Sequence, residues 1–239
     1  MSPTATLATV TVARRFNGPL TSANGGYACG LLARHVDGPA EVTLRRPVPL
    51  ERELELERHD DGRVTLHDGD TLLAEGGPAL PLDIEPPYRP SVAEAHEAAR
   101  AGFGELDAMF ADCYVCSAGR RDGLGAHFGA LPSHPDMTGA VVIPDATVPH
   151  HDGGIAIETA WAALDCPSYT PPLWTAERPS LLAQMTAEVL EPMPLGDPVV
   201  VVGWTLSRDG RKHGSATALL SADGRTLARA RTLWIELRA

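Results

Sequence analysis

Two glycine pairs and two carboxylates are the features of this sequence best suited to chemistry. Asn24-Gly25-Gly26 precedes one apolar, helix-like run, and His151-Asp152-Gly153-Gly154 precedes another. Glycine weakens a helix interior, so a pair at a helix start indicates a backbone that another group approaches closely. The first turn of a helix also has unpaired N–H groups and a partial positive charge. Such a start can hold the oxyanion that develops on a substrate carbonyl.

Glu158 and Asp165 lie on the second predicted helix, whereas the first, Tyr27–Val36, contains no acidic residue. Seven residues apart, the two carboxylates share one helix face and are separated by about 10 Å along it. A carboxylate opposite a helix start can activate water, which is worth about 10²–10⁴ in rate. We therefore expect one complete site, built from Asn24-Gly25-Gly26 and a carboxylate of the second helix. Glu158 could instead only stabilise its helix dipole, and Asp165 could only bond local backbone.

The elements that position these groups occur twice in the same order. Each half of the sequence indicates a strand, then the helix with its glycine pair, then antiparallel strands separated by Asp-Gly turns. Pro47-Val48-Pro49-Leu50 of the first half matches Pro192-Met193-Pro194-Leu195 of the second. A repeated order of this kind predicts a duplicated unit that packs as a pseudo-dimer.

A proline-rich stretch separates the two halves. Five prolines occur between residues 78 and 90, and a run that is compatible with a helix follows, interrupted at Gly102 and Gly104. We divide the chain into an N-terminal domain (1–85), a linker with a helix (86–110) and a C-terminal domain (111–239).

Composition narrows the classes of partner. A net charge of −11 argues against nucleic acid or an anionic membrane surface. No stretch has the roughly 20 apolar residues that span a bilayer, and the N-terminus lacks the pattern of a signal peptide. We expect a cytoplasmic protein with reduced cysteines.

Cys113 and Cys116 form a Cys-x-x-Cys pair, which raises the question of zinc. Zinc needs about four ligands, and only His127 and His134 follow, at loose spacing. Buried packing cysteines are the expectation, with no metal and no other cofactor.

The motifs in this order resemble those of the double-hotdog acyl-CoA thioesterases. NGGYACGLLARHV with EVTLRRPVPL is similar to their N-terminal half, and CYVCSAGRRDGLGAHF with HHDGG is similar to the phenylacetic-acid-type thioesterases. The resemblance implies an α+β tandem hotdog fold, each half being an antiparallel sheet wrapped around a central helix. It also implies hydrolysis of an acyl-CoA or related acyl thioester at a site between the two central helices, without a metal.

The resemblance further implies particular residues. An acidic residue late in the second helix acts with a hydroxyl and an amide side chain from the sheet, which fits Asp165, with Thr186 and Gln184 as the nearest candidates. The glycine-rich helix starts would bind the thioester, which assigns substrate contacts to the residues Gly25, Gly26, Gly153, Gly154 and His151. Arg45, Arg46, Arg120 and Arg121 are either contacts for the phosphates of coenzyme A or ordinary surface charge.

Two other functions remain open on this fold. A β-hydroxyacyl thioester dehydratase would need His150 or His151 to act with Glu158. A non-catalytic protein that binds acyl thioesters would need no base at all. In each case the partner is a small-molecule acyl thioester, and a homodimer of this chain is compatible with the fold.

Overall fold

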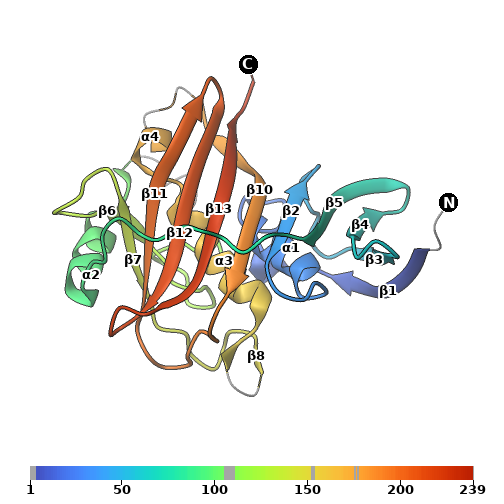
Figure 1. Ribbon diagram of the computed structural model, residues 1–239, viewed down its shortest axis with the longest axis horizontal. Coiled ribbons are helices and arrows are strands. Elements are labelled where there is room, and N and C mark those ends of the chain that lie inside the picture. The colour runs from blue at the N-terminus through green and yellow to red at the C-terminus, as the bar shows by residue number, and fades with distance from the viewer. Residues whose placement is uncertain (1–3, 105–110, 152–153, 175, 177, 239) are drawn as a thin grey trace.

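A single antiparallel sheet dominates the computed structural model, which describes residues 4–104, 111–151, 154–174, 176 and 178–238 (Figure 1). Within these residues the sheet has 11 strands, in the spatial order β1-β3-β4-β5-β2-β10-β13-β12-β11-β7-β6. The strands of the first half are β1 (Thr4–Thr11), β2 (Ala40–Leu44), β3 (Glu53–His59), β4 (Val64–Asp68) and β5 (Thr71–Pro78). Those of the second half are β6 (Phe128–Ala130), β7 (Thr138–Val142), β10 (Ser180–Val189), β11 (Val199–Asp209), β12 (Lys212–Ser221) and β13 (Thr226–Glu236). A small hairpin, β8 (His150–His151) with β9 (Gly154–Ile155), forms a separate sheet.

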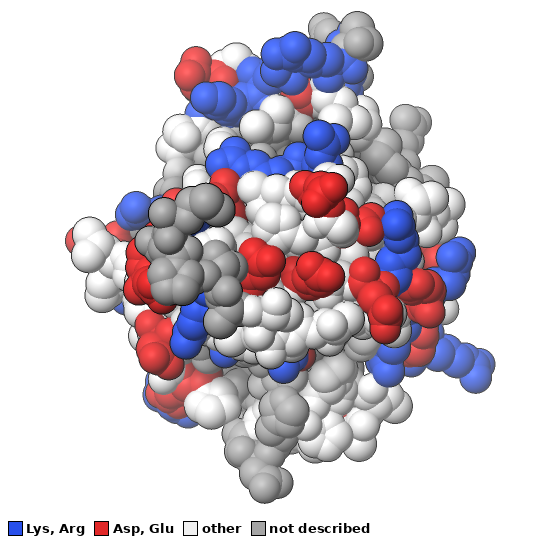
Figure 2. Space-filling view, turned by 90° about the vertical axis from the view of Figure 1, so that its right-hand side faces the viewer, with Lys and Arg blue, Asp and Glu red and all other residues white. Residues whose placement is uncertain are grey.

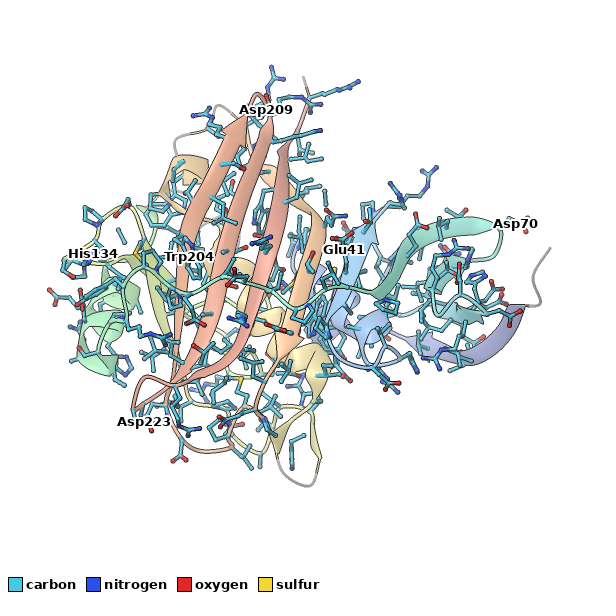
Figure 3. All side chains as sticks on the ribbon, in the orientation of Figure 1. Glu41, Asp70, His134, Trp204, Asp209 and Asp223 are labelled. Carbon is cyan, nitrogen blue, oxygen red and sulfur yellow. The ribbon has the colours of Figure 1, made fainter. Side chains whose placement is uncertain are left out.

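The strand order is the same in both halves when it is counted outward from the middle of the sheet. The middle is the antiparallel pairing of β2 with β10, in which Glu41 lies opposite Thr186. From β2 the order runs through β5, β4 and β3 to β1, and from β10 it runs through β13, β12 and β11 to β7. Figure 3 labels Glu41 at this junction. The two halves therefore meet through equivalent strands and form one continuous sheet.

Two helices lie against one face of the sheet and cross each other there. They are α1 (Gly25–Ala33), which precedes β2, and α3 (Ile157–Asp165), which precedes β10. Both are almost wholly buried. A Cβ added to Gly26 would lie 2.5 Å from the Trp161 carbonyl oxygen, and one added to Gly30 would lie 2.4 Å from Glu158 Cα. Glycine at these two positions, one helical turn apart, therefore allows the close crossing of α1 and α3.

The opposite face of the sheet is covered by the segment between the halves. Residues 79–91 cross β10, β13, β12 and β11 in an extended conformation (Figure 1) and lead into α2 (Val92–Ala101). Leu82 and Ile84 are buried in a second apolar cluster with Trp204, which Figure 3 labels. Arg229 donates to the Ile84 carbonyl oxygen at 2.9 Å and pairs with Glu85. The proline-rich stretch around residues 82–85 is therefore packed against the sheet.

Local signals in the sequence account for the ends of the elements. Asn24 caps α1 by accepting from the Tyr27 N–H, and Ser91 caps α2 by accepting from the Glu94 N–H. The α2 helix ends at Gly102, whose φ of +66° suits glycine. The predicted Asp-Gly turns are confirmed at the ends of β3, β4, β11 and β12.

The segment around Cys113 and Cys116 forms turns. One prediction about local structure is wrong. The second glycine pair does not begin α3, because Gly154 belongs to β9 and the helix cap is Ala156. At Gly154 a Cβ would lie 2.7 Å from Pro192 Cβ, so this glycine serves the packing of the β8–β9 hairpin on the 192–193 loop.

The surface of the N-terminal end carries charges of both signs. Figure 2 shows arginines and carboxylates interleaved on the face formed by the right-hand end of Figure 1. Among the described residues, no helix is both long enough and apolar enough to cross a membrane.

Candidate active site between the two halves

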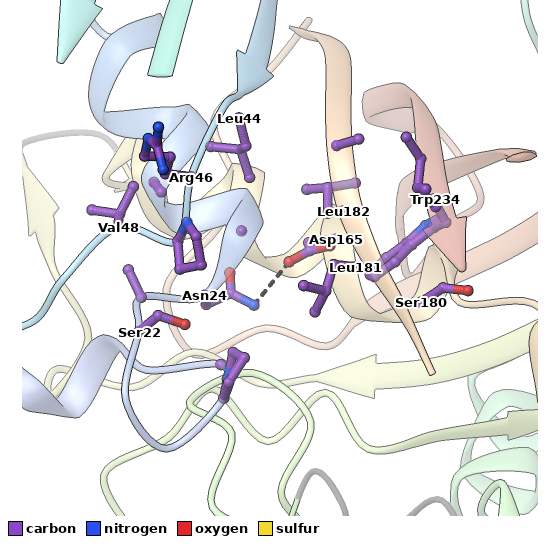
Figure 4. Close-up of a pocket in the computed structure, with 18 of the residues that line it drawn as sticks. Ser22, Asn24, Leu44, Arg46, Val48, Asp165, Ser180, Leu181, Leu182 and Trp234 are labelled. Carbon is purple, nitrogen blue, oxygen red and sulfur yellow. Dashed lines mark hydrogen bonds between the residues drawn. The ribbon is translucent and has the colours of Figure 1, made fainter. Parts of the chain in front are cut away.

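A pocket of about 270 Å³ lies where the start of α1 meets the end of α3 (Figure 4). Its wall is mostly apolar and combines both halves of the chain. The first half contributes the loop before α1, Gly25 and the 44–48 segment after β2. The second half contributes Asp165, the first residues of β10 and the end of β13. Neither half alone would enclose this space.

Asp165 connects the two helices at the back of the pocket. Its Oδ2 accepts from Asn24 Nδ2 at 2.8 Å and from the Gly26 backbone N–H at 2.9 Å. Asn24 uses its other side-chain atom, Oδ1, to cap α1. The carboxylate of one half is thus held at the positive end of the helix of the other half, which favours a negative charge there.

The other oxygen of Asp165 is left free. Its Oδ1 is buried and has no hydrogen-bond partner among the described residues, and the residue is only 2% exposed. Burial raises the pKa of Asp165 to about 7, while the hydrogen bonds from Gly26 and Asn24 act in the opposite direction and the Cys113 charge adds to the rise. An unpaired carboxylate oxygen beside an apolar pocket can accept a proton from a bound molecule.

The two glycines that begin α1 have different neighbours. The Gly26 N–H is occupied by Asp165, and a Cβ on Gly26 would lie 2.5 Å from Asp165 Cβ. Gly25 lines the pocket, and a Cβ there would meet the side chain of Leu182 at 2.9 Å. The N–H groups of a first helical turn have no acceptor within their own helix. The Gly25 N–H, at the pocket wall, is therefore the backbone donor of this pair that a ligand can use.

Glu158 lies outside the pocket, near the other end of α3. Its carboxylate is 3.6 Å from Arg34, which follows the last residue of α1, and it packs beside Gly30. The structure therefore separates the two carboxylates that the sequence left as alternatives, because α1 and α3 cross so that only the end of α3 reaches the start of α1.

Three other substrate contacts were predicted at the second glycine pair, namely Gly154, Gly153 and His151. Gly154 is in β9 and does not line the pocket. Gly153 lies outside the described residues, as does the side chain of His151. The backbone of His151 is in β8, where it pairs with Gly154.

The predicted partners Thr186 and Gln184 point away from the pocket. Both bond Glu41 across the junction of the halves, through Thr186 Oγ1 at 2.8 Å and Gln184 Nε2 at 3.1 Å. A register shift between Leu182 and Gln184 changes which side chains face inward. Leu182 consequently lines the pocket while Gln184 lies on the outer face, a switch that strand alternation does not predict.

Of the arginines considered as phosphate contacts, some line the pocket and others do not. Arg45 and Arg46 line the pocket, and Arg45 pairs with Glu75 at 2.7 Å. Arg120 is instead engaged with Asn17 and Asp122 away from the pocket. The repeated Pro-x-Pro-Leu motif was a signal for this wall, because Pro47 and Val48 belong to it.

Sequence reasoning assigned no role to Cys166, which follows Asp165 and lines the pocket with Cys113. The sulfur atoms of these two residues are 3.7 Å apart. Hydrogen bonds from the Cys116 and Cys166 thiols hold the pKa of Cys113 well below its ordinary value. This contact could not be predicted from the sequence, because Cys166 lies about 50 residues after the Cys-x-x-Cys pair.

Comparisons with known proteins address the fold. No protein-family model matches the sequence. No curated protein matches it either. Solved structures do resemble it along nearly its whole length. An acyl-CoA thioesterase II from Mycobacterium marinum is 13% identical, with a TM-score of 0.57 over 99% of this chain and 96% of that one.

Two further structures give the same result. A protein proposed to be a thioesterase II from Thermobifida fusca is 15% identical, with a TM-score of 0.59 over 99% of this chain and 96% of that chain. A conserved protein of unknown function with a hotdog fold, from Alicyclobacillus acidocaldarius, is 11% identical, with a TM-score of 0.53 over 97% and 93% of the two chains. The chain therefore has the hotdog fold, and its overall structure is like that of thioesterases.

Proposed function

We propose that this protein hydrolyses an acyl-CoA or a related acyl thioester, with Asp165 as the general base. The observation that carries the proposal is the state of the Asp165 carboxylate. One oxygen is fixed by Asn24 and Gly26 of the opposite half, and the other is buried without a partner at the wall of an apolar pocket. The similarity to structures named as thioesterases supports the choice of substrate class.

Each group has a defined part in the proposed reaction. The acyl chain lies along the apolar wall formed by Leu44, Val48 and Leu182, with the thioester carbonyl near the start of α1. Asp165 takes a proton from water as the water oxygen bonds to the carbonyl carbon. The Gly25 N–H donates to the resulting oxyanion. The carbon–sulfur bond then breaks, and the departing thiolate takes the proton from Asp165, leaving a carboxylic acid and a free thiol.

We also infer that the chain is a tandem hotdog with central helices α1 and α3, divided as predicted at 1–85, 86–110 and 111–239. The equivalent strand orders on the two sides of the β2–β10 junction support this division. A base from one half and an oxyanion donor from the other would make the site depend on both halves. Arg46, at the pocket wall, is a candidate contact for a phosphate of the thiol carrier.

The dehydratase alternative has less support. It needs a histidine near a carboxylate, and no histidine among the described residues lines the pocket. His150 Nδ1 bonds the Val148 carbonyl oxygen, and Glu158 pairs with Arg34.

A thiol-release assay over short, medium, long and aromatic acyl-CoAs tests the proposed function. The wild type should release thiol from part of this panel. Leu182→Trp should abolish release by filling the pocket, whereas Leu206→Trp, which changes an exposed leucine of β11, should not. Absence of release from every thioester would refute hydrolysis. A change in enoyl absorbance would then indicate a dehydratase, and a rise in melting temperature with acyl-CoA alone would indicate a binding protein.

A further inference from the structure

Three cysteine thiols converge beside the pocket. The Sγ atoms of Cys113, Cys116 and Cys166 all lie within 4.8 Å of one another, and all three residues are buried. Two come from the turns before β6, and the third follows α3, about 50 residues later in the chain. All are free thiols. The fourth cysteine, Cys29, is buried in α1 outside this group.

The spacing of the sulfurs fits a tetrahedral metal ion. Zinc–sulfur bonds are about 2.3 Å long, which places two sulfur ligands of a tetrahedral ion about 3.8 Å apart. The Cys113 and Cys166 sulfurs are 3.7 Å apart. Bringing Cys116 to the same spacing requires a movement of about 1 Å or less. Cys-x-x-Cys is also the usual half of a structural zinc site.

The neighbours of the cluster suit sulfurs that carry negative charge. The Val115 N–H donates to Cys113 Sγ at 3.4 Å, and Asn24 Nδ2 lies 3.6 Å from Cys166 Sγ. Donors of this kind orient thiolate ligands and are part of most metal sites. Packing alone would explain buried cysteines, but it does not require N–H donors aimed at two of the three sulfurs.

The histidines that follow the Cys-x-x-Cys pair are used elsewhere. His127 Nδ1 donates to the Ala99 carbonyl oxygen, and His134 stacks on Tyr88. Cys113 and Cys166 line the pocket, so pocket water can reach the remaining position of an ion held by the three sulfurs.

We propose that Cys113, Cys116 and Cys166 form a three-thiolate site for a single zinc ion, with pocket water as its fourth ligand. Each thiol releases its proton to solvent as its sulfur bonds to the ion. Thiolate ligands select soft or borderline cations, which favours zinc over magnesium or calcium. The ion would hold the 113–116 turns against the end of α3. This inference does not rest on the proposed hydrolysis.

Metal content and cobalt spectroscopy test the site directly. Protein purified under reducing conditions from zinc-supplemented medium should contain about one zinc ion per chain by mass spectrometry of the metal. After the zinc is removed by a chelator, titration with Co²⁺ should produce sulfur-to-cobalt charge-transfer absorbance and the visible bands of tetrahedral cobalt. Adding Zn²⁺ should raise the melting temperature by roughly 5 °C or more.

Cysteine variants supply the matched comparison. Cys116→Ser removes a ligand that does not line the pocket and should abolish both the charge-transfer absorbance and the thermal shift. Cys29→Ser also removes a buried thiol, but it should leave both intact. If the Cys116→Ser variant bound cobalt like the wild type, the proposal would be overturned.

The wild type alone can also overturn it, so the proposal does not depend on the folding of a variant. The proposal would be overturned if the wild-type protein took up no zinc and gave no cobalt–sulfur absorbance. A disulfide between two of the three cysteines in the freshly purified, metal-free protein would have the same consequence.

Discussion

The two ends of the α1–α3 crossing differ in chemistry. At one end Asn24 caps α1, Gly25 borders the pocket and the buried Asp165 accepts from Asn24 and Gly26. At the other end α3 begins at Ile157, its cap residue Ala156 makes no side-chain capping hydrogen bond, and Glu158 pairs with the half-exposed Arg34. The last residue of α3 is Asp165, whereas the last residue of α1 is Ala33.

The two ends share their helix packing but not their side chains. Both ends keep the close helix crossing, through Gly26 at one and Gly30 at the other. Among the described residues, a carboxylate, a side-chain cap and the pocket of Figure 4 occur together only at the end with Gly26. The other end has an ion pair that solvent reaches, and such pairs contribute little to the free energy of unfolding. The close packing of the two helices is thus common to both ends. The side chains that we propose for the site, Asn24 and Asp165, lie at one end.

Apart from substitution of the carboxylates themselves, Gly26→Ala should have the largest effect on thiol release. Its Cβ would meet backbone and Asp165 at 2.5 Å, so the helices must separate and the carboxylate must move. We expect a loss of about 1–3 kcal/mol in the free energy of unfolding and about 100-fold in thiol release. Denaturant-induced unfolding would measure the change in the free energy of unfolding, and the thiol-release assay would measure the change in activity.

Gly25→Ala is the matched control, since the nearest atoms that its Cβ would meet belong to the side chains of Leu182 and Leu44 and not to backbone. Its free energy of unfolding should change by less than about 1 kcal/mol. Equal destabilisation by the two substitutions would contradict the distinction between the helix crossing and the pocket wall.

Asn24→Ala should have an intermediate effect on thiol release. It removes a helix cap and a hydrogen bond to a buried carboxylate, which together should cost about 2–4 kcal/mol of stability. Thiol release should fall by at least about tenfold, because Asp165 loses a partner that orients it.

Ser91→Ala removes the cap of α2, far from the pocket, and offers a control for capping alone. It should cost about 0.5–2 kcal/mol and leave kcat/KM unchanged. If Asn24→Ala behaved like Ser91→Ala in both measurements, Asn24 would be only a cap.

Arg34→Ala should have the smallest effect. It breaks the ion pair with Glu158 at the opposite end of the crossing, where the arginine side chain is 44% exposed. We expect a change of about 0–1 kcal/mol in the free energy of unfolding and no change in thiol release. A large loss of activity in this variant would show that the second end also takes part in the reaction.

The turns and the first helix were predictable because their signals are local. Asp-Gly pairs, helix caps and strand alternation each depend on a few neighbouring residues, and they gave the β3–β5 and β11–β13 hairpins and the position of α1. Asn24 and Gly25 could be assigned to the site for the same reason. Their roles follow from beginning a helix.

The rest depended on contacts between distant segments. The sequence could not decide between Glu158 and Asp165, because the choice rests on which end of α3 reaches α1. The placement of Gln184 and Thr186 failed because a bulge reverses the alternation of β10. The second glycine pair was misassigned because Gly154 serves the hairpin contact with Pro192, which mimics a helix-start signal in the sequence.

Substitution of the two carboxylates of α3, compared in one assay, tests most directly whether Asp165 is the general base. Asp165→Asn and Glu158→Gln each remove a negative charge with almost no change in size, and kcat/KM for thiol release is measured on the best acyl-CoA. Asp165→Asn should lower kcat/KM by about 10²–10⁴-fold. Glu158→Gln, whose ion pair lies outside the pocket, should keep kcat/KM within about threefold of the wild type. Activity that survives in Asp165→Asn, or that is lost only in Glu158→Gln, would contradict the assignment of Asp165 as the base.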